Sequence, residues 1–221
     1  MKHYYPNFDE FLRLCERGNT IPVYRQLLAD ALTPVTAYQR LAKPVGFAQA
    51  EHSFLLESVV GGERIARFSF VAADPSATFT ARRENITIRR GHDEEHVASC
   101  DPLAELKAIL DAYKAVHLPD LPRFTGGVVG YAAYDMVRYY ENLPDAPEDD
   151  RDLADLCFGL YRTMVIFDHV SKTIKVVSNA HVAGDPGAAY REAVDSIEPV
   201  SYTHLRAHET SLHLVCRLLL E

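Results

Sequence analysis

The sequence predicts an α+β fold, in which helices pack on a mainly antiparallel sheet. Three observations support this class. Several short segments alternate apolar and polar residues with the two-residue period of strands, as Ile86 and Ile88 do. Most of these segments follow one another through short, turn-like connections, which is typical of hairpins. Helical patterns are few and lie between the strands. We expect about six or seven strands.

Helix signals begin at three capping residues. Asn7 is a potential N-cap with Glu10 three residues later, which is a capping-box pattern. Thr33 precedes Pro34, a favourable pair for the start of a short helix. Asp101 caps the clearest helix, and its apolar residues recur on one face: Leu103, Leu106, Ile109, Leu110 and Tyr113.

The remaining segments are extended or irregular. Residues 20–30 should begin extended and then become irregular, because Pro22 restrains Ile21. Residues 91–100 read as a polar connection, residues 126–143 as a strand running into a short helix, and residues 143–155 as an acidic surface loop. The predicted strands are Ser53–Glu57, Arg64–Val71, a hairpin around Glu84-Asn85, Leu160–Asp168 and Thr173–Asn179.

Composition excludes several classes of function. The chain has 221 residues, of which 48% are apolar, and a formal net charge of −8, which argues against nucleic-acid and membrane surfaces. No apolar run is long enough to span a bilayer, and the first residues do not resemble a secretory signal. Four scattered cysteines without a CxxC motif favour a reducing, cytoplasmic setting and argue against a zinc site.

The C-terminal residues read differently from the rest of the chain. Residues 187–198 look helical, but codons for Val200–Thr210 can be chosen to spell a transposon end and adapter used in preparing sequencing libraries. Leu214–Glu221 can spell the flow-cell end of the same adapter. We therefore expect one domain over residues 1–198, an artefactual tail over residues 199–221, and a natural protein that continues beyond residue 198.

One predicted hairpin gathers charged and hydroxyl groups. A strand ends on Glu57-Ser58, Gly61-Gly62 permit a tight return, and alternation places Arg67 and Ser69 on the face that carries Glu57. A carboxylate, a hydroxyl and a guanidinium suit a small zwitterion. The alternative is an ordinary Glu–Arg pair across a hairpin.

No catalytic or metal site is predicted. Residues 126–130 match neither a dinucleotide-binding motif nor a P-loop, so close backbone packing is the better interpretation of their glycines. Asp168-His169 reads as a turn, and Glu148-Asp149-Asp150 as a solvated loop.

Five segments together carry a family resemblance: "IPVYRQLLAD", "TPVTAYQRL", "SFLLESVVGGERIARFSF", "FTGGVVGYAAYDMVRYYENLP" and "MVIFDHVSKTIKVV". In this order and at these separations, over about residues 5–195, they resemble the N-terminal region of anthranilate synthase component I. That family converts chorismate and ammonia into anthranilate and pyruvate with Mg²⁺. A glutamine amidotransferase subunit supplies the ammonia, and tryptophan inhibits at a site built partly from the "LLES" segment.

The resemblance implies that Ser58 and Glu57 bind L-tryptophan as an effector. Arg67 is added from strand alternation. The family's chorismate site and Mg²⁺ ligands belong to its C-terminal half, so this chain alone should be an incomplete part of the fold and catalytically silent. Two alternatives remain open: the N-terminal region of aminodeoxychorismate synthase component I, and a stand-alone amino-acid-binding module.

Overall fold

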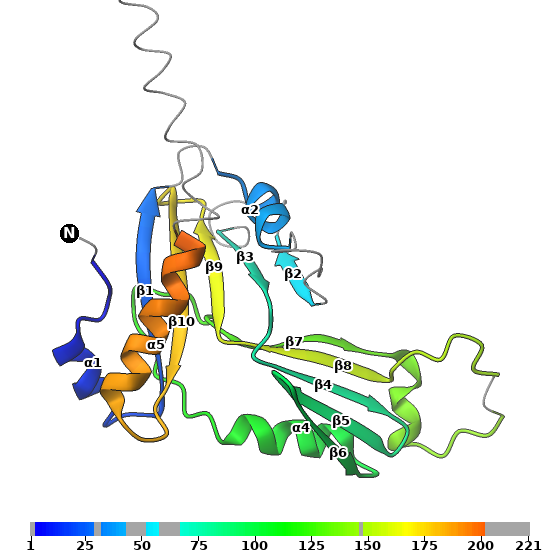
Figure 1. Cartoon of the computed structure of the whole chain (residues 1–221). Coiled ribbons are helices and arrows are strands. Elements are labelled where there is room, and N and C mark those ends of the chain that lie inside the picture. Colours follow the sequence, from blue (N-terminus) through cyan, green and yellow to red (C-terminus); the bar gives the residue numbers. More distant parts are fainter. Residues whose placement is uncertain (1–2, 29–31, 43–51, 58–66, 146–147, 202–221) are drawn as a thin grey trace, which may run out of the picture.

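The computed structural model describes residues 3–28, 32–42, 52–57, 67–145 and 148–201 (Figure 1). These residues form two five-stranded antiparallel sheets. The first sheet has the order β1 (Thr20–Leu28), β10 (Thr173–His181), β9 (Thr163–Asp168), β3 (Phe68–Ala73) and β2 (Ser53–Leu56). The second has the order β6 (Asp93–Ala98), β5 (Asn85–Arg90), β4 (Ala77–Arg82), β8 (Leu156–Tyr161) and β7 (Gly127–Ala132). The predicted α+β class is confirmed.

Helices cover one face of each sheet. Residues of α1 (Phe8–Leu14), α2 (Pro34–Leu41) and α5 (Pro186–Pro199) pack on the first sheet, and α4 (Pro102–Asp111) packs on the second. The 3₁₀ helix η1 (Tyr134–Tyr139) follows β7. The predicted caps are confirmed: side chains of Asn7, Thr33 and Asp101 accept hydrogen bonds from the N–H groups of Glu10, Thr36 and Ala104.

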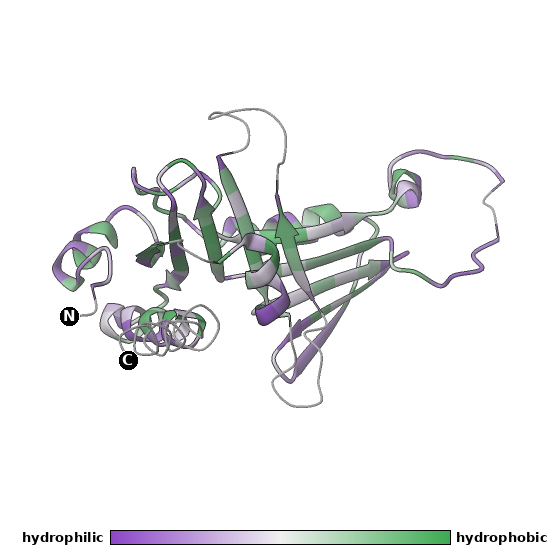
Figure 2. Cartoon of the chain, turned by 90° about the horizontal axis from the view of Figure 1, so that it is seen from above, coloured by the Kyte–Doolittle hydropathy of each residue, from purple (hydrophilic) through white to green (hydrophobic). Residues whose placement is uncertain are grey.

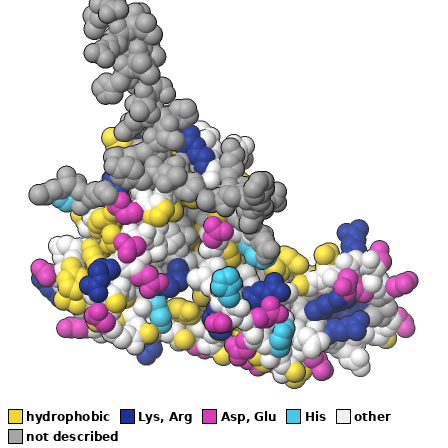
Figure 3. Space-filling view, viewed as in Figure 1, with side chains coloured by type: hydrophobic (Ala, Val, Ile, Leu, Met, Phe, Trp, Pro, Cys, Tyr) yellow, Lys and Arg dark blue, Asp and Glu magenta, His cyan; other side chains and the backbone are white. Residues whose placement is uncertain are grey.

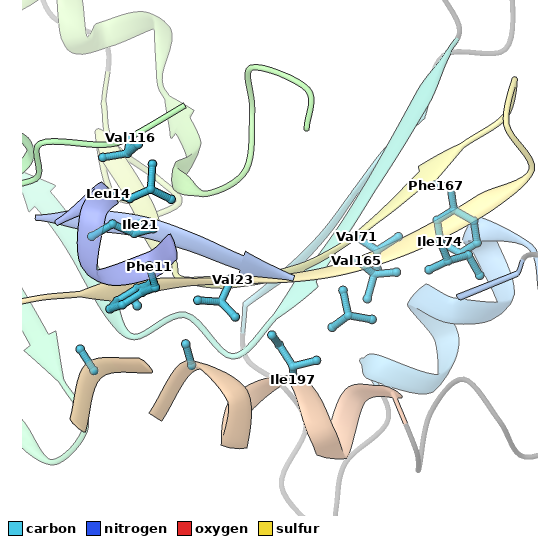
Figure 4. Packing of buried hydrophobic residues seen from close by; sticks show 14 of the residues in the cluster. Phe11, Leu14, Ile21, Val23, Val71, Val116, Val165, Phe167, Ile174 and Ile197 are labelled. Carbon is cyan, nitrogen blue, oxygen red and sulfur yellow. The ribbon is translucent and has the colours of Figure 1, made fainter. Parts of the chain in front are cut away.

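The first sheet is buried on both faces. On the helix side, Ile21, Val23 and Val176 are fully buried, and Ile197 of α5 packs against the strands (Figure 4). Burying each such side chain contributes about 1.5–3 kcal/mol to folding. The opposite face carries a second cluster around Met164, Ile166 and Val177. The apolar cluster of the second sheet lies under α4, whereas the edge strand β6 is mostly hydrophilic and exposed (Figure 2).

The expected number of strands was too low. The described residues contain ten strands, because β1 and β6 were predicted as largely irregular and the predicted strand Leu160–Asp168 spans the end of β8 and all of β9. β8 belongs to the second sheet and β9 to the first, and the chain changes sheets at Arg162. It makes the reverse change between β3 and β4, where Asp74 adopts a positive φ of 52°. Only Arg162 separates β8 from β9, and with no turn residue there the sequence pattern does not reveal the change of sheet, whereas Asp74-Pro75-Ser76 between β3 and β4 is a recognisable turn signal.

Two segments predicted as irregular are strands. Residues 93–98 form the edge strand β6, whose side chains are almost all exposed and therefore lack apolar alternation. β1 continues to Leu28 despite Pro22, because β1 lies at the edge of its sheet, where proline is tolerated. Residues 202–221 lie outside the described residues, and the artefactual tail remains a prediction.

Candidate effector site

The predicted alternation of the β2–β3 hairpin is confirmed. Leu56 pairs with Phe70, and Phe54 and Phe70 lie in one apolar cluster while Leu55 and Val71 lie in the other. The Phe54 ring packs edge-on against Tyr161, with centroids 4.8 Å apart. Glu57 follows β2 directly and is exposed. Ser58 and the Gly61-Gly62 turn lie outside the described residues.

Arg67, the residue before β3, contacts a buried carboxylate from the neighbouring strand. Its Nη2 donates to Oδ2 of Asp168 at 2.8 Å, and its Nε lies 3.3 Å from both carboxylate oxygens. Its guanidinium carbon also lies 4.8 Å from the centroid of the Phe68 ring. The side chain of Asp168 is 5% exposed and that of Arg67 47%. Such a two-pronged pair fixes the direction of the guanidinium.

Asp168 also closes the turn between β9 and β10. Its Oδ1 accepts hydrogen bonds from the N–H groups of Val170 at 3.0 Å and Ser171 at 3.2 Å, which confirms the predicted turn role. Burial opposes ionisation of Asp168, but the hydrogen bonds from Arg67 and from these N–H groups outweigh it and lower its pKa to about 2. The carboxylate is therefore charged at neutral pH.

Ser69 is fully buried and lies 2.7 Å, Oγ to Nε2, from His169. The N–H of His169 donates to the carbonyl oxygen of Arg67 at 2.9 Å. Among the described residues, Arg67 pairs with Asp168 and Ser69 with His169, and the expected grouping of Arg67 and Ser69 with Glu57 around one ligand stays a prediction. The direction of Arg67 was not fixed by alternation because β3 begins only at Phe68.

Sequence reasoning missed Asp168 as a partner of Arg67. The two residues are 101 positions apart, and the β3–β9 register that places Phe68 opposite Asp168 cannot be read from local patterns. The one sequence feature that pointed to Asp168 was its place at the end of an apolar strand, and an acidic residue in that place is equally typical of a turn.

The other predicted features have structural roles. A Cβ at Gly130 would lie 2.6 Å from Cα of Phe158, so close packing explains this glycine as expected. Asp149 in the acidic loop pairs with Arg82 at 2.7 Å. Over the described ranges, no cluster of three or more His, Cys, Asp or Glu side chains could hold a metal ion, and no helix there could cross a membrane. Acidic and basic side chains are interspersed on the face shown in Figure 3.

Comparison with known proteins identifies the family. The family model described as chorismate binding enzyme matches residues 51–217. This chain belongs to the chorismate binding enzyme family. A relative named anthranilate synthase component 1 from Acetivibrio thermocellus is 36% identical over 197 residues, which cover 89% of this chain and 39% of that protein. One of the same name from Thermus thermophilus is 44% identical over 157 residues, covering 71% and 32%.

A solved structure agrees with this assignment. Anthranilate synthase component I from Streptococcus pneumoniae matches with a TM-score of 0.50 and 26% identity, over 79% of this chain and 36% of that one. The resemblance to anthranilate synthase component I is thus confirmed, and the fold is part of that structure. The chain spans about a third to two fifths of the length of the curated relatives it matches.

Proposed function

We propose that this chain is the tryptophan-sensing, N-terminal part of an anthranilate synthase large subunit. The observation that carries the proposal is the similarity, at 36% and 44% identity, to proteins named anthranilate synthase component 1. The complete protein would convert chorismate and ammonia into anthranilate and pyruvate. Its partner would be a glutamine amidotransferase subunit, in keeping with the name component 1.

The hairpin of β2 and β3 supports the sensing role. Glu57 is an exposed carboxylate at the end of β2 and can receive the ammonium group of a free amino acid. Ser58 follows it and would add a hydroxyl group. We assign no catalytic residue and no Mg²⁺ ligand to the described residues, so catalysis would require the remainder of the protein.

A chimera tests the proposal. Residues 1–198 replace the matching region of the Thermus thermophilus relative, and anthranilate and pyruvate are measured with ammonia as nitrogen donor. Tryptophan should inhibit the chimera. Ser58→Ala and Ser58→Phe should raise the half-inhibitory tryptophan concentration about tenfold while largely sparing turnover, because a ligand hydrogen bond is lost. Ser196→Ala, on the exposed side of α5, is the matched control.

Two results would contradict the proposal. Aminodeoxychorismate as the product would assign the chain to the other branch of the family. Inhibition unchanged by both Ser58 variants, or a parallel loss of turnover and inhibition, would remove the sensing role from this hairpin.

A further inference from the structure

A buried carboxylate holds a half-exposed cation at the edge of the first sheet. Asp168 meets Nε and Nη2 of Arg67 and leaves Nη1 outside these hydrogen bonds. Because Asp168 is 5% exposed and Arg67 47%, the carboxylate forms the inner side of the pair and the guanidinium the outer side. A cation held in this way keeps donors available to an anion that approaches from solvent.

Further contacts fix the position of Arg67. Its guanidinium lies against the Phe68 ring, a cation–π arrangement. Its backbone carbonyl accepts from the N–H of His169, and the adjacent Ser69–His169 contact ties β3 to the same turn. An arginine that is already ordered loses less side-chain entropy when it binds a ligand.

The neighbouring strand supplies the opposite charge. Leu56 pairs with Phe70, so Glu57 stands one position further along β2, toward the end of the hairpin from which Arg67 enters β3. An exposed carboxylate and an oriented guanidinium at the same end of a hairpin match the two charged groups of a free amino acid.

We infer that Asp168 is a positioning residue of the effector site, which orients Arg67 to receive the carboxylate of a free amino acid whose ammonium group contacts Glu57. This inference rests on the proposed function. It adds the β9–β10 turn, more than 100 residues from the "LLES" segment, to the determinants of effector affinity.

Asp168→Asn separates the two tasks of this side chain. An asparagine Oδ1 can still accept from Val170 and Ser171, so the turn is retained, but the amide nitrogen in place of Oδ2 cannot accept from Nη2 of Arg67, which breaks the two-pronged pair. The matched control is Asp135→Asn, which breaks an exposed ion pair with Arg138 whose Nε–Oδ1 distance is 2.9 Å. Arg67→Gln removes the cation itself at a half-exposed position. It is the second test variant, to be used if Asp168→Asn folds poorly.

The experiment titrates the full 221-residue chain with L-tryptophan and with tryptamine, which lacks the carboxylate, and follows both by NMR. Asp168→Asn and Arg67→Gln should each weaken tryptophan binding about tenfold and leave tryptamine binding unchanged. Asp135→Asn should change neither. The Nε–H signal of Arg67 should lose its protection in Asp168→Asn, which reports the orientation of the side chain directly.

The outcomes are distinguishable. If the wild-type chain binds neither compound, the proposed function fails, and this inference fails with it. If tryptophan binds equally to the wild type and to Asp168→Asn, or if tryptophan and tryptamine are weakened alike, the sensing role stands but Asp168 does not position a carboxylate receptor.

Discussion

Nδ2 of Asn179 donates a hydrogen bond to the carbonyl oxygen of Thr125 at 2.7 Å. Asn179 lies in β10 of the first sheet, and Thr125 lies two residues before β7 of the second. The N–H of Asn179 also donates to the carbonyl of Arg162, the residue at which the chain changes sheets. Asn179 therefore links the first sheet to the segment that enters β7 through its side chain, and to the residue between β8 and β9 through its backbone N–H.

Asn179→Ala should destabilise the protein by about 1–3 kcal/mol, because the partly buried Thr125 carbonyl loses its donor. Asn179 is 9% exposed. Asn142→Ala, at an exposed position just before the acidic loop, is the control and should change the free energy of unfolding by less than about 0.5 kcal/mol. Urea unfolding of the two variants measures the difference. Equal stability of both would show that this hydrogen bond does not hold the sheets together.

Gly130→Ala should destabilise the chain by about 2–4 kcal/mol, since β7 and β8 would have to separate. An added Cβ would collide with the carbonyl oxygen of Cys157 and lie 2.6 Å from Cα of Phe158, both backbone atoms. Gly184→Ala is the matched control, because nothing lies within 4 Å of a Cβ at that position. Thermal melts that shift equally for both variants would contradict a packing role for Gly130.

Sequence patterns predicted correctly those elements that depend on residues near one another in the chain. The N-caps Asn7, Thr33 and Asp101 were identified because a capping side chain and the N–H group that donates to it lie three residues apart. The division of residues 156–168 between two sheets was missed, because it depends on which distant strands β8 and β9 pair with. β6 was missed because solvent covers both of its faces and leaves no apolar face to read.

The candidate site shows the same limit. Glu57 could be placed at a strand end by alternation, and the structure agrees. The partner of Arg67 could not, because Asp168 is brought to it by the register of β3 and β9. Ser58 as a tryptophan contact came from family resemblance and remains a prediction.

Tyr24 should reduce stability at alkaline pH. Burial, followed by the nearby Asp120 carboxylate and Tyr5, raises its pKa to about 12, whereas an unfolded tyrosine ionises near 10. A raised pKa means that its contribution to stability is complete below about pH 10 and is lost as pH rises toward 12. Between pH 9 and pH 11.5, the free energy of unfolding of Tyr24→Phe should therefore fall by about 1–2 kcal/mol less than that of the wild type. Urea unfolding at the two pH values tests this, and identical losses would contradict it.

The stabilisation that Asp168 provides should be lost at acidic pH, rather than at alkaline pH as for Tyr24. Its folded-state pKa of about 2 lies below the unfolded value of about 3.9, so the folded protein binds fewer protons. The stabilisation is complete above about pH 4 and disappears as pH falls through 2, with a size of about 1–2 kcal/mol after allowance for the exposed half of Arg67.

Asp168→Asn, which cannot ionise, should be less stable than the wild type at pH 6, and the difference should shrink between pH 4 and pH 2. Asp135→Asn should show a much smaller change, because both members of its ion pair are near the surface. A stability gap for Asp168→Asn that stays constant from pH 6 to pH 2 would mean that the charge of Asp168, and hence its pairing with Arg67, does not stabilise the fold.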